Sequence, residues 1–315
     1  NQLEALTIIF TETYYWITVV LMFLIHVGFC IYEVSASRRK NMLHTLVKNT
    51  MLIPLVTVTF YFFGWWLYFA FQNGPGIIGG MIAAPWATPW SELMGAHMGG
   101  EPNQQGLSSE DTMAWARING VFWAAFLLFS WTAASIVSGA VIERIRSGAF
   151  WILAILIGSF CWVIDAAWGW SESGWMVQKL GYHDAYASGV IHAIAGGFAL
   201  GVLIHLGARI GKFSADGTPQ DIRPHNPWLA TVGLFLIYTG FWGFYVACNI
   251  PIIDIGDAAG MDASFFSTTN IYLTPTSTSA ITFNFLMSLS GGMMVGYLVS
   301  KGDPFWAYSL GLAGI

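Results

Sequence analysis

Seven stretches of mostly apolar residues, each close to the length of a membrane-spanning helix, constrain the fold of this chain more than any other feature. A helix needs about 20 such residues to cross the hydrocarbon core of a bilayer. Only 9% of the residues are charged, which leaves too little polar surface for a soluble globular protein. We therefore predict an all-α membrane protein, a polytopic transmembrane helical bundle. The predicted spans are 11–34, 51–72, 119–142, 148–168, 186–207, 227–250 and 278–299, and an eighth begins at 304.

The basic residues indicate which ends of these spans face the cytoplasm. With the N-terminus outside, ten of the twelve lysines and arginines fall on the cytoplasmic side, and only Arg117 and Lys179 fall outside. Cytoplasmic loops carry an excess of Lys and Arg in membrane proteins. We therefore expect an integral protein of the plasma (inner) membrane with its N-terminus outside. The ten are Arg38, Arg39, Lys40, Lys48, Arg144, Arg146, Arg209, Lys212, Arg223 and Lys301.

Several other protein classes find no support in the sequence. The three cysteines lie in apolar stretches without paired spacing, so we expect neither a disulfide framework nor a metal site. No long basic run points to nucleic acid, and no nucleophile–base constellation points to an enzyme. We also expect no cofactor. A haem or pigment protein could use His26, His192 and His205 as axial ligands, but their spacing matches no cofactor motif.

Ionisable residues in or beside the spans are the candidate functional groups, because burying them in a bilayer is costly. His192 lies among small residues in the fifth span and is either a bundle-facing histidine bonded to a carbonyl or a pore-lining proton relay. Asp184 is placed to cap that helix, with attraction of cations as the alternative. Asp165, near the outer end of the fourth span, either bonds loop backbone or draws cations. Glu33 is expected to pair with the arginines that follow the first span or with nearby backbone.

Several motifs resemble those of ammonium transporters. The first span and its loop contain Gly-Phe-Cys-Ile-Tyr-Glu at 28–33 and Arg-Arg-Lys-Asn at 38–41. The exit of the third span reads Ala-Ser-Ile-Val-Ser-Gly-Ala-Val-Ile-Glu-Arg-Ile at 134–145. Trp168-Gly169, Gly174-Trp175, Asp184 and His192 then follow in the family's order, before Gly-Phe-Trp-Gly-Phe at 240–244. By these matches, from residue 28 to residue 249, the chain is identified as a member of the ammonium transporter superfamily, near its Amt branch.

The resemblance implies an architecture and an assembly. Family members are homotrimers with one narrow pore per subunit, built from two five-helix inverted repeats. Residues 1–315 would form one ammonium transporter-like transmembrane domain, with the second repeat incomplete. The predicted topology agrees, because the sixth span enters from the cytoplasm.

The resemblance also implies an outer vestibule that holds the ammonium ion. Trp168 would form one wall of this vestibule, together with Phe129, Cys248 and Asp165. Aromatic faces can hold a small cation through the ring quadrupole, although by periodicity alone these aromatics look like ordinary bundle residues. Cys248 stands where the family often has a serine, and Asp165 stands where a histidine is common.

Further inward, the resemblance implies a pore that admits ammonia. Phe129 and Phe244 would be the pore gate, His192 would line the pore, and Asp184 would be a structural acid near the vestibule. Loss of a proton would remove the desolvation penalty of a bare cation, and neutral ammonia would then pass the gate. His192 would offer a hydrogen bond inside the pore.

Two departures favour an alternative to transport. Tyr245 replaces the asparagine that usually follows the gate phenylalanine of the sixth span. The family places a second pore histidine in its tenth span, and this chain has no histidine after His225. The alternative is a non-transporting relative that senses ammonium or docks as a structural subunit in a larger membrane complex. The retained gate residues and His192 favour transport.

Overall fold

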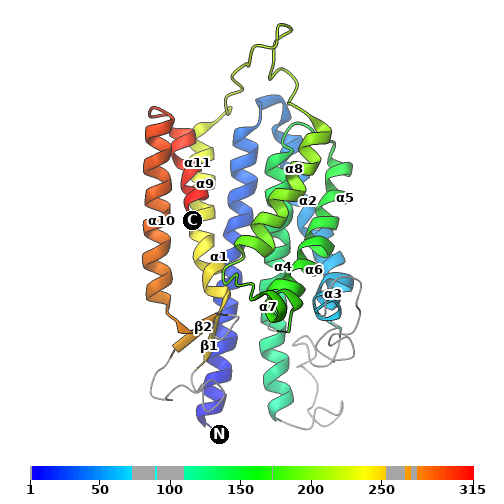
Figure 1. Ribbon diagram of the computed structural model, residues 1–315, viewed down its shortest axis with the longest axis vertical. Coiled ribbons are helices and arrows are strands. Elements are labelled where there is room, and N and C mark those ends of the chain that lie inside the picture. The colour runs from blue at the N-terminus through cyan, green and yellow to red at the C-terminus, as the bar shows by residue number, and fades with distance from the viewer. Residues whose placement is uncertain (1, 73–88, 91–109, 172, 253–266, 271–274) are drawn as a thin grey trace.

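The computed structural model describes residues 2–72, 89–90, 110–171, 173–252, 267–270 and 275–315 (Figure 1). Within these ranges seven helical segments are long and apolar enough to cross a membrane, which confirms the predicted polytopic α-helical membrane protein. These segments are Ile8–Ala36, Arg39–Ala70, Arg117–Ala140, Ser147–Gly169, Ser188–Leu206, Pro227–Ala247 and Thr278–Val299. Most of the stretch between the predicted spans 51–72 and 119–142 lies outside the described residues.

Several of the spans contain more than one helical type. The elements that build the first four spans and the short helix after them are α1 (Gln2–Ala36), η1 (Arg39–Asn41), α2 (Met42–Thr59), η2 (Phe60–Gly64), α3 (Trp65–Ala70), α4 (Glu110–Ala140), α5 (Ser147–Leu156), η5 (Ile157–Cys161), α6 (Trp162–Gly169) and α7 (Trp175–Leu180). The later helices are η6 (Ser188–Ala193), α8 (Ile194–Leu206), α9 (Pro227–Ala247), α10 (Thr278–Val299) and α11 (Pro304–Gly314). Of these, η2, η5 and η6 are π-helical turns, which occur frequently at functional sites.

The second span begins earlier than predicted. We expected it over 51–72, but α2 begins at Met42. Lys48 therefore lies inside a membrane-spanning helix rather than in the cytoplasmic loop where the sequence placed it. Its charge kept it out of the predicted span, because hydropathy counts a lysine as polar whether or not a partner neutralises it.

Close approach of α1 and α9 organises the bundle. A Cβ added to Gly28 would lie 2.6 Å from the carbonyl oxygen of Gly233, and one added to Gly240 would lie 2.6 Å from the backbone nitrogen of Ile25. Small residues let membrane helices approach this closely and gain dispersion energy. The two helices are the first spans of the two predicted repeats, and Figure 1 shows α10 and α11 packed beside α9.

A small antiparallel sheet lies at the end of the bundle where α1 begins (Figure 1). Its strand order is β1 (Asn249–Ile252), β2 (Ser267–Asn270) and β3 (Pro275–Thr276), with Asn249 opposite Asn270. The sheet falls largely between the predicted spans 227–250 and 278–299, where the sequence analysis identified no strands because runs this short carry little periodicity.

At the opposite end, Glu143 joins three connecting segments. Its side chain is fully buried, and it accepts hydrogen bonds from the Arg38 backbone nitrogen at 2.7 Å, Arg38 Nε at 3.0 Å and Asn41 Nδ2 at 2.7 Å. Arg209 lies 3.6 Å away. Burial raises the pKa of Glu143, but the hydrogen bonds from Asn41 and Arg38 outweigh it and leave the pKa below its ordinary value. The motif residues at 38–41 and Glu143 thus act as one polar clasp.

Candidate functional site

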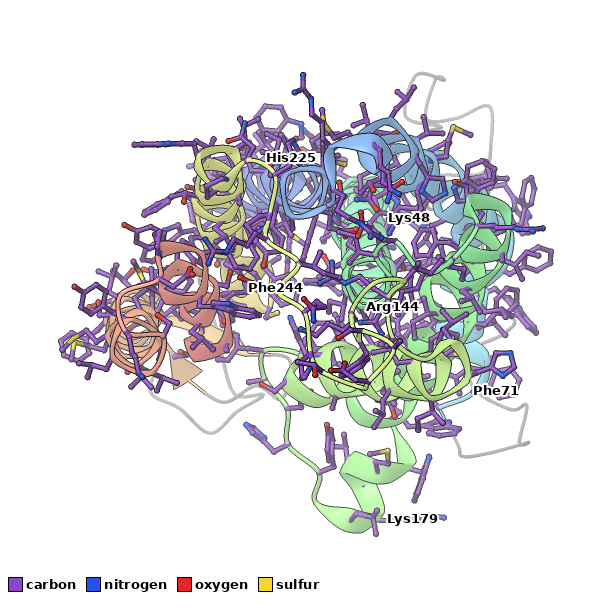
Figure 2. The ribbon with its side chains drawn as sticks, turned by 90° about the horizontal axis from the view of Figure 1, so that it is seen from above. Lys48, Phe71, Arg144, Lys179, His225 and Phe244 are labelled. Carbon is purple, nitrogen blue, oxygen red and sulfur yellow. The ribbon has the colours of Figure 1, made fainter. Side chains whose placement is uncertain are left out.

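Phe129 and Phe244, the predicted gate residues, meet in the interior of the bundle. Phe129 comes from α4 and Phe244 from α9, and their ring centroids lie 4.7 Å apart at 77°. Both side chains are buried. Figure 2 shows Phe244 inside the ring of helices, whereas Lys179 lies at the periphery. Edge-to-face packing of this kind is attractive, so the pair forms a closed aromatic contact between the two helices.

A tryptophan completes this contact, but it is Trp170 rather than Trp168. The ring of Trp170 lies 5.1 Å from that of Phe129, and its indole nitrogen donates to the carbonyl oxygen of Asp184 at 2.7 Å. Trp168 is half-buried and packs against Trp175 at 6.0 Å. The residue that contacts Phe129 was therefore missed by the sequence analysis.

The signal for Trp170 was present in the sequence. Residues two apart on a helix point about 200° apart, so Trp168 and Trp170 face different surroundings. Trp162, Ala166 and Trp170 recur every four residues and are all buried, which is the spacing of a core-facing stripe.

Asp184 holds the start of the fifth span. Its carboxylate accepts hydrogen bonds from the backbone nitrogens of Ser188, Gly189 and Val190 at 2.8, 2.7 and 2.9 Å. These are among the amides that a helix leaves unpaired at its first turn. Gly189 has no room for a side chain, because an added Cβ would lie 1.8 Å from the hydroxyl of Tyr182. Asp184 thereby fixes the turn from which η6 projects.

His192 lies on η6 beside the phenylalanine pair. Its ring is 5.7 Å from that of Phe244 and 6.1 Å from that of Phe241. The Nδ1 atom lies 3.0 Å from the carbonyl oxygen of Ala187. Because a carbonyl only accepts, this contact assigns the proton to Nδ1 and leaves Nε2 as a hydrogen-bond acceptor.

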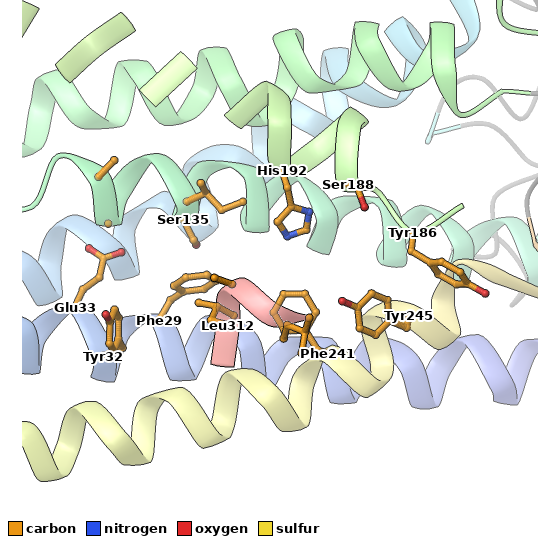
Figure 3. Close-up of a pocket in the computed structure, with 15 residues that line it drawn as sticks. Phe29, Tyr32, Glu33, Ser135, Tyr186, Ser188, His192, Phe241, Tyr245 and Leu312 are labelled. Carbon is orange, nitrogen blue, oxygen red and sulfur yellow. The ribbon is translucent and has the colours of Figure 1, made fainter. Parts of the chain in front are cut away.

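A cavity of about 450 Å³, here called the central cavity, runs along His192 (Figure 3). Its walls come from α1, α4, η6, α9 and α11 and are mostly apolar. Figure 3 shows Tyr186 and Tyr245 at one end, His192 and Phe241 in the middle, and Glu33 at the other end. A volume of this size accommodates a small molecule among apolar walls with few polar groups.

Glu33 and Lys48 form a buried ion pair at that far end. Lys48 Nζ lies 3.2 Å from Glu33 Oε2, and both side chains are 1% exposed. We expected Glu33 to pair with the arginines after the first span or with nearby backbone, and the structure corrects this because Arg38 is bound to Glu143 instead. The error follows from the misplaced start of the second span, which left Lys48 out of consideration.

The remaining vestibule candidates lie apart from this cavity. Cys248 is buried, with its thiol 3.3 Å from the carbonyl oxygen of Phe244. Asp165 is half-buried in the first turn of α6. A second cavity of about 270 Å³ is lined by Tyr186, Tyr245 and residues of α10. The predicted vestibule residues line neither of these two cavities.

The histidines of the haem hypothesis have different surroundings. His26 is buried, with its ring 5.1 Å from that of Trp131, whereas His192 lines the central cavity and His205 is exposed. Among the residues that the structure describes, no three His, Cys, Asp or Glu side chains gather as metal ligands.

Sequence comparison finds similarity to ammonium transporters. The family model described as Ammonium Transporter Family matches residues 13–301. The chain is 27% identical over 302 residues to ammonium transporter Amt2 of Haloferax mediterranei, which covers 95% of this chain and 60% of that protein. It is 26% identical over 297 residues to ammonium transporter Amt1 of Methanocaldococcus jannaschii, with coverage of 94% and 61%. The chain thus spans about three fifths of the length of these two curated relatives.

Solved structures share the fold. A protein titled "Sensor Amt Protein" superposes with a TM-score of 0.68 at 22% identity, covering 99% of this chain and 67% of the other. Mep2 of Candida albicans superposes with a TM-score of 0.64 at 18% identity, covering 96% and 58%. At these identities the likeness shows the architecture of the helical bundle alone.

Proposed function

Because the chain belongs to the ammonium transporter family, we propose that it moves ammonium across the membrane by letting neutral ammonia pass beside His192. The observation that carries this proposal is the position of His192, which contacts Phe244 and lines the central cavity. Its Nε2 acceptor suits ammonia, which has N–H groups to donate.

The proposed passage begins at the aromatic residues. Ammonium is attracted by ring faces at the outer mouth, where Trp168, Phe129, Cys248 and Asp165 are the vestibule candidates and Trp170 joins them through its contact with Phe129. The ion gives a proton to outer water, because a bare cation in an apolar passage carries a large desolvation penalty.

Ammonia then crosses the contact between Phe129 and Phe244, which must open transiently. Beyond it, His192 accepts a hydrogen bond, and the mostly apolar central cavity holds the neutral molecule. Asp184 keeps His192 in position by fixing the first turn of η6. Potassium has no proton to lose, so the same step discriminates against it.

The proposal includes an orientation and an assembly. The polar clasp of Arg38, Asn41 and Glu143, with Arg209 beside it, gathers basic residues at one end of the bundle. By the positive-inside tendency, this end is cytoplasmic and the N-terminus is outside, in the plasma (inner) membrane. We propose one transmembrane domain over 1–315 and a homotrimer, or docking in a larger membrane complex.

Flux measurements in proteoliposomes test this function. We expect methylammonium and ammonium uptake by the wild type, loss of most uptake with His192→Ala, and altered rate or selectivity with Phe129→Ala. His205→Ala is the matched control, because this histidine is exposed and lies at the end of α8. Absence of flux through folded, correctly oligomerised wild type would favour the non-transporting sensor or structural subunit.

A further inference from the structure

Within the part of the chain that the structure describes, Glu33 uses only one of its two carboxylate oxygens. Oε2 accepts from Lys48 Nζ at 3.2 Å and from Ser138 Oγ at 2.8 Å. Oε1 is buried and has no hydrogen-bond partner among the residues that the structure describes. The side chain is 1% exposed and lines the central cavity, where Figure 3 shows it at one end. A buried acceptor without a partner is costly, so its position at a cavity wall needs an explanation.

Beside this end of the cavity, three different groups hold the amine of Lys48. Lys48 Nζ is held by Glu33 Oε2, by the carbonyl oxygen of Ser138 at 2.8 Å, and by the ring of Phe150, whose centroid is 4.8 Å away. A carboxylate, a carbonyl and an aromatic face together satisfy the charged amine. A carboxylate shares its negative charge between its two oxygens, so the oxygen without a partner, Oε1, is the acceptor left for a ligand.

Two other buried carboxylates lack such a free oxygen. In Glu143, one oxygen binds Arg38 and Asn41 and the other binds Arg38. Asp184 binds Ser188 through one oxygen and Gly189 and Val190 through the other. Both oxygens of Glu143 and of Asp184 have partners, and Glu33 differs from these two carboxylates in its Oε1.

We propose that Glu33 Oε1 forms a cation-binding site for ammonium, or for a small primary alkylammonium, at the end of the central cavity farther from the N-terminus. This inference rests on the proposed function and adds a second binding site to it. The site lies at the end of the cavity opposite Tyr186 and Tyr245. The ligand donates an N–H to Oε1, and Phe29 lines the same end of the cavity (Figure 3). Thus His192 offers an acceptor to neutral ammonia and Glu33 offers one to the cation.

Equilibrium binding of radiolabelled methylammonium to purified protein in nanodiscs tests the site. The double variant Glu33→Gln/Lys48→Met removes both charges together, so that no buried charge is left unpaired. We expect its affinity to fall about tenfold or more, as for loss of a hydrogen bond to a charged group. The matched control is Glu12→Gln/Arg117→Met. It removes a different ion pair, which joins α1 to α4 through a 2.7 Å contact outside the cavity. We expect this control to bind like the wild type.

A second variant blocks the site and leaves the ion pair intact. A Cβ added to Gly139 would lie 3.7 Å from Glu33 Oε1, and only Glu33 is within 4 Å of it. Gly139→Val therefore fills the space in front of Oε1, and we expect the same loss of binding. Wild-type affinity in either folded variant would overturn the inference, and Gly139→Val decides the matter should the double variant not fold.

Flux separates this inference from the proposed function. Binding that depends on Glu33 without flux in the wild type would support the site and contradict transport. If the wild type shows flux, and the Glu33 and Gly139 variants bind methylammonium as tightly as the wild type, the result would support transport and contradict the site.

Discussion

The aromatic cluster around Phe129 and the central cavity beside His192 are neighbours with opposite characters. The cluster is closed: Phe129 contacts Phe244 at 4.7 Å and Trp170 at 5.1 Å, and all three rings are buried. The cavity is open space of about 450 Å³ whose largely apolar walls include His192 and Glu33 among their polar residues. The closed cluster leaves no room for the water that would surround a charged species. The cavity, in contrast, offers hydrogen-bond acceptors at His192 and Glu33. Under the proposed function, this difference lets the cluster exclude charge and the cavity accept substrate.

Removing a ring from the cluster should have the largest effect. Trp170→Ala should lower the stability of the folded protein by about 3–5 kcal/mol, because truncation of a buried tryptophan leaves a large void. Trp168→Ala should cost less, since this side chain is half-buried. Thermal unfolding of both variants in the same detergent measures the contrast, and equal losses would contradict the central place given to Trp170.

Breaking the ion pair of the cavity tests whether its polar end is structurally independent of the cluster. Lys48→Met leaves the Glu33 carboxylate buried without its partner, which should destabilise the protein by about 3–4 kcal/mol. The double variant Glu33→Gln/Lys48→Met should recover most of that loss. Unfolding midpoints of the single and double variants provide the comparison. A double variant as unstable as the single one would show that unpaired charge is not the cause.

Changing the thiol beside the cluster should have a smaller effect and should act on substrate. Cys248→Ser introduces a stronger hydrogen-bonding group next to Phe244. If Cys248 lies in the vestibule, the KM for methylammonium should fall by about threefold, the scale of one modest hydrogen bond. Uptake kinetics check this, with unchanged stability as the control. An unchanged KM would remove Cys248 from the vestibule.

The polar clasp lies outside both regions, so its titration should affect stability and barely affect transport. The pKa of Glu143 is lower in the folded protein than its ordinary value of 4.5. A carboxylate with a depressed pKa contributes stability above its ordinary pKa and loses it as the pH falls through the folded pKa. The free energy of unfolding of the wild type should therefore decrease as the pH falls below about 4.5, and that of Glu143→Gln should decrease less. Thermal unfolding of both proteins, measured over a series of acidic pH values, compares the two decreases in stability.

The sequence predicted the membrane fold well, because a span is defined by length and hydropathy that a single chain displays directly. It also led to Phe129, Phe244 and His192, although only through resemblance, since their periodicity is that of ordinary core residues. One error and one omission have physical causes. Lys48 looked like a loop residue because its buried partner is remote in sequence, and Trp170 was overlooked because a motif was weighed above the helical face. Pairing between distant segments is not visible in local pattern.

The proposed function requires a passage that carries ammonia and excludes cations that have no proton to lose. Wild-type protein in proteoliposomes should therefore be exposed in turn to an ammonium gradient and to an equal potassium gradient, with internal pH and ion flux recorded. We predict ammonium movement that depends on His192 and no potassium movement above that of empty vesicles. Comparable flux of both ions would contradict it.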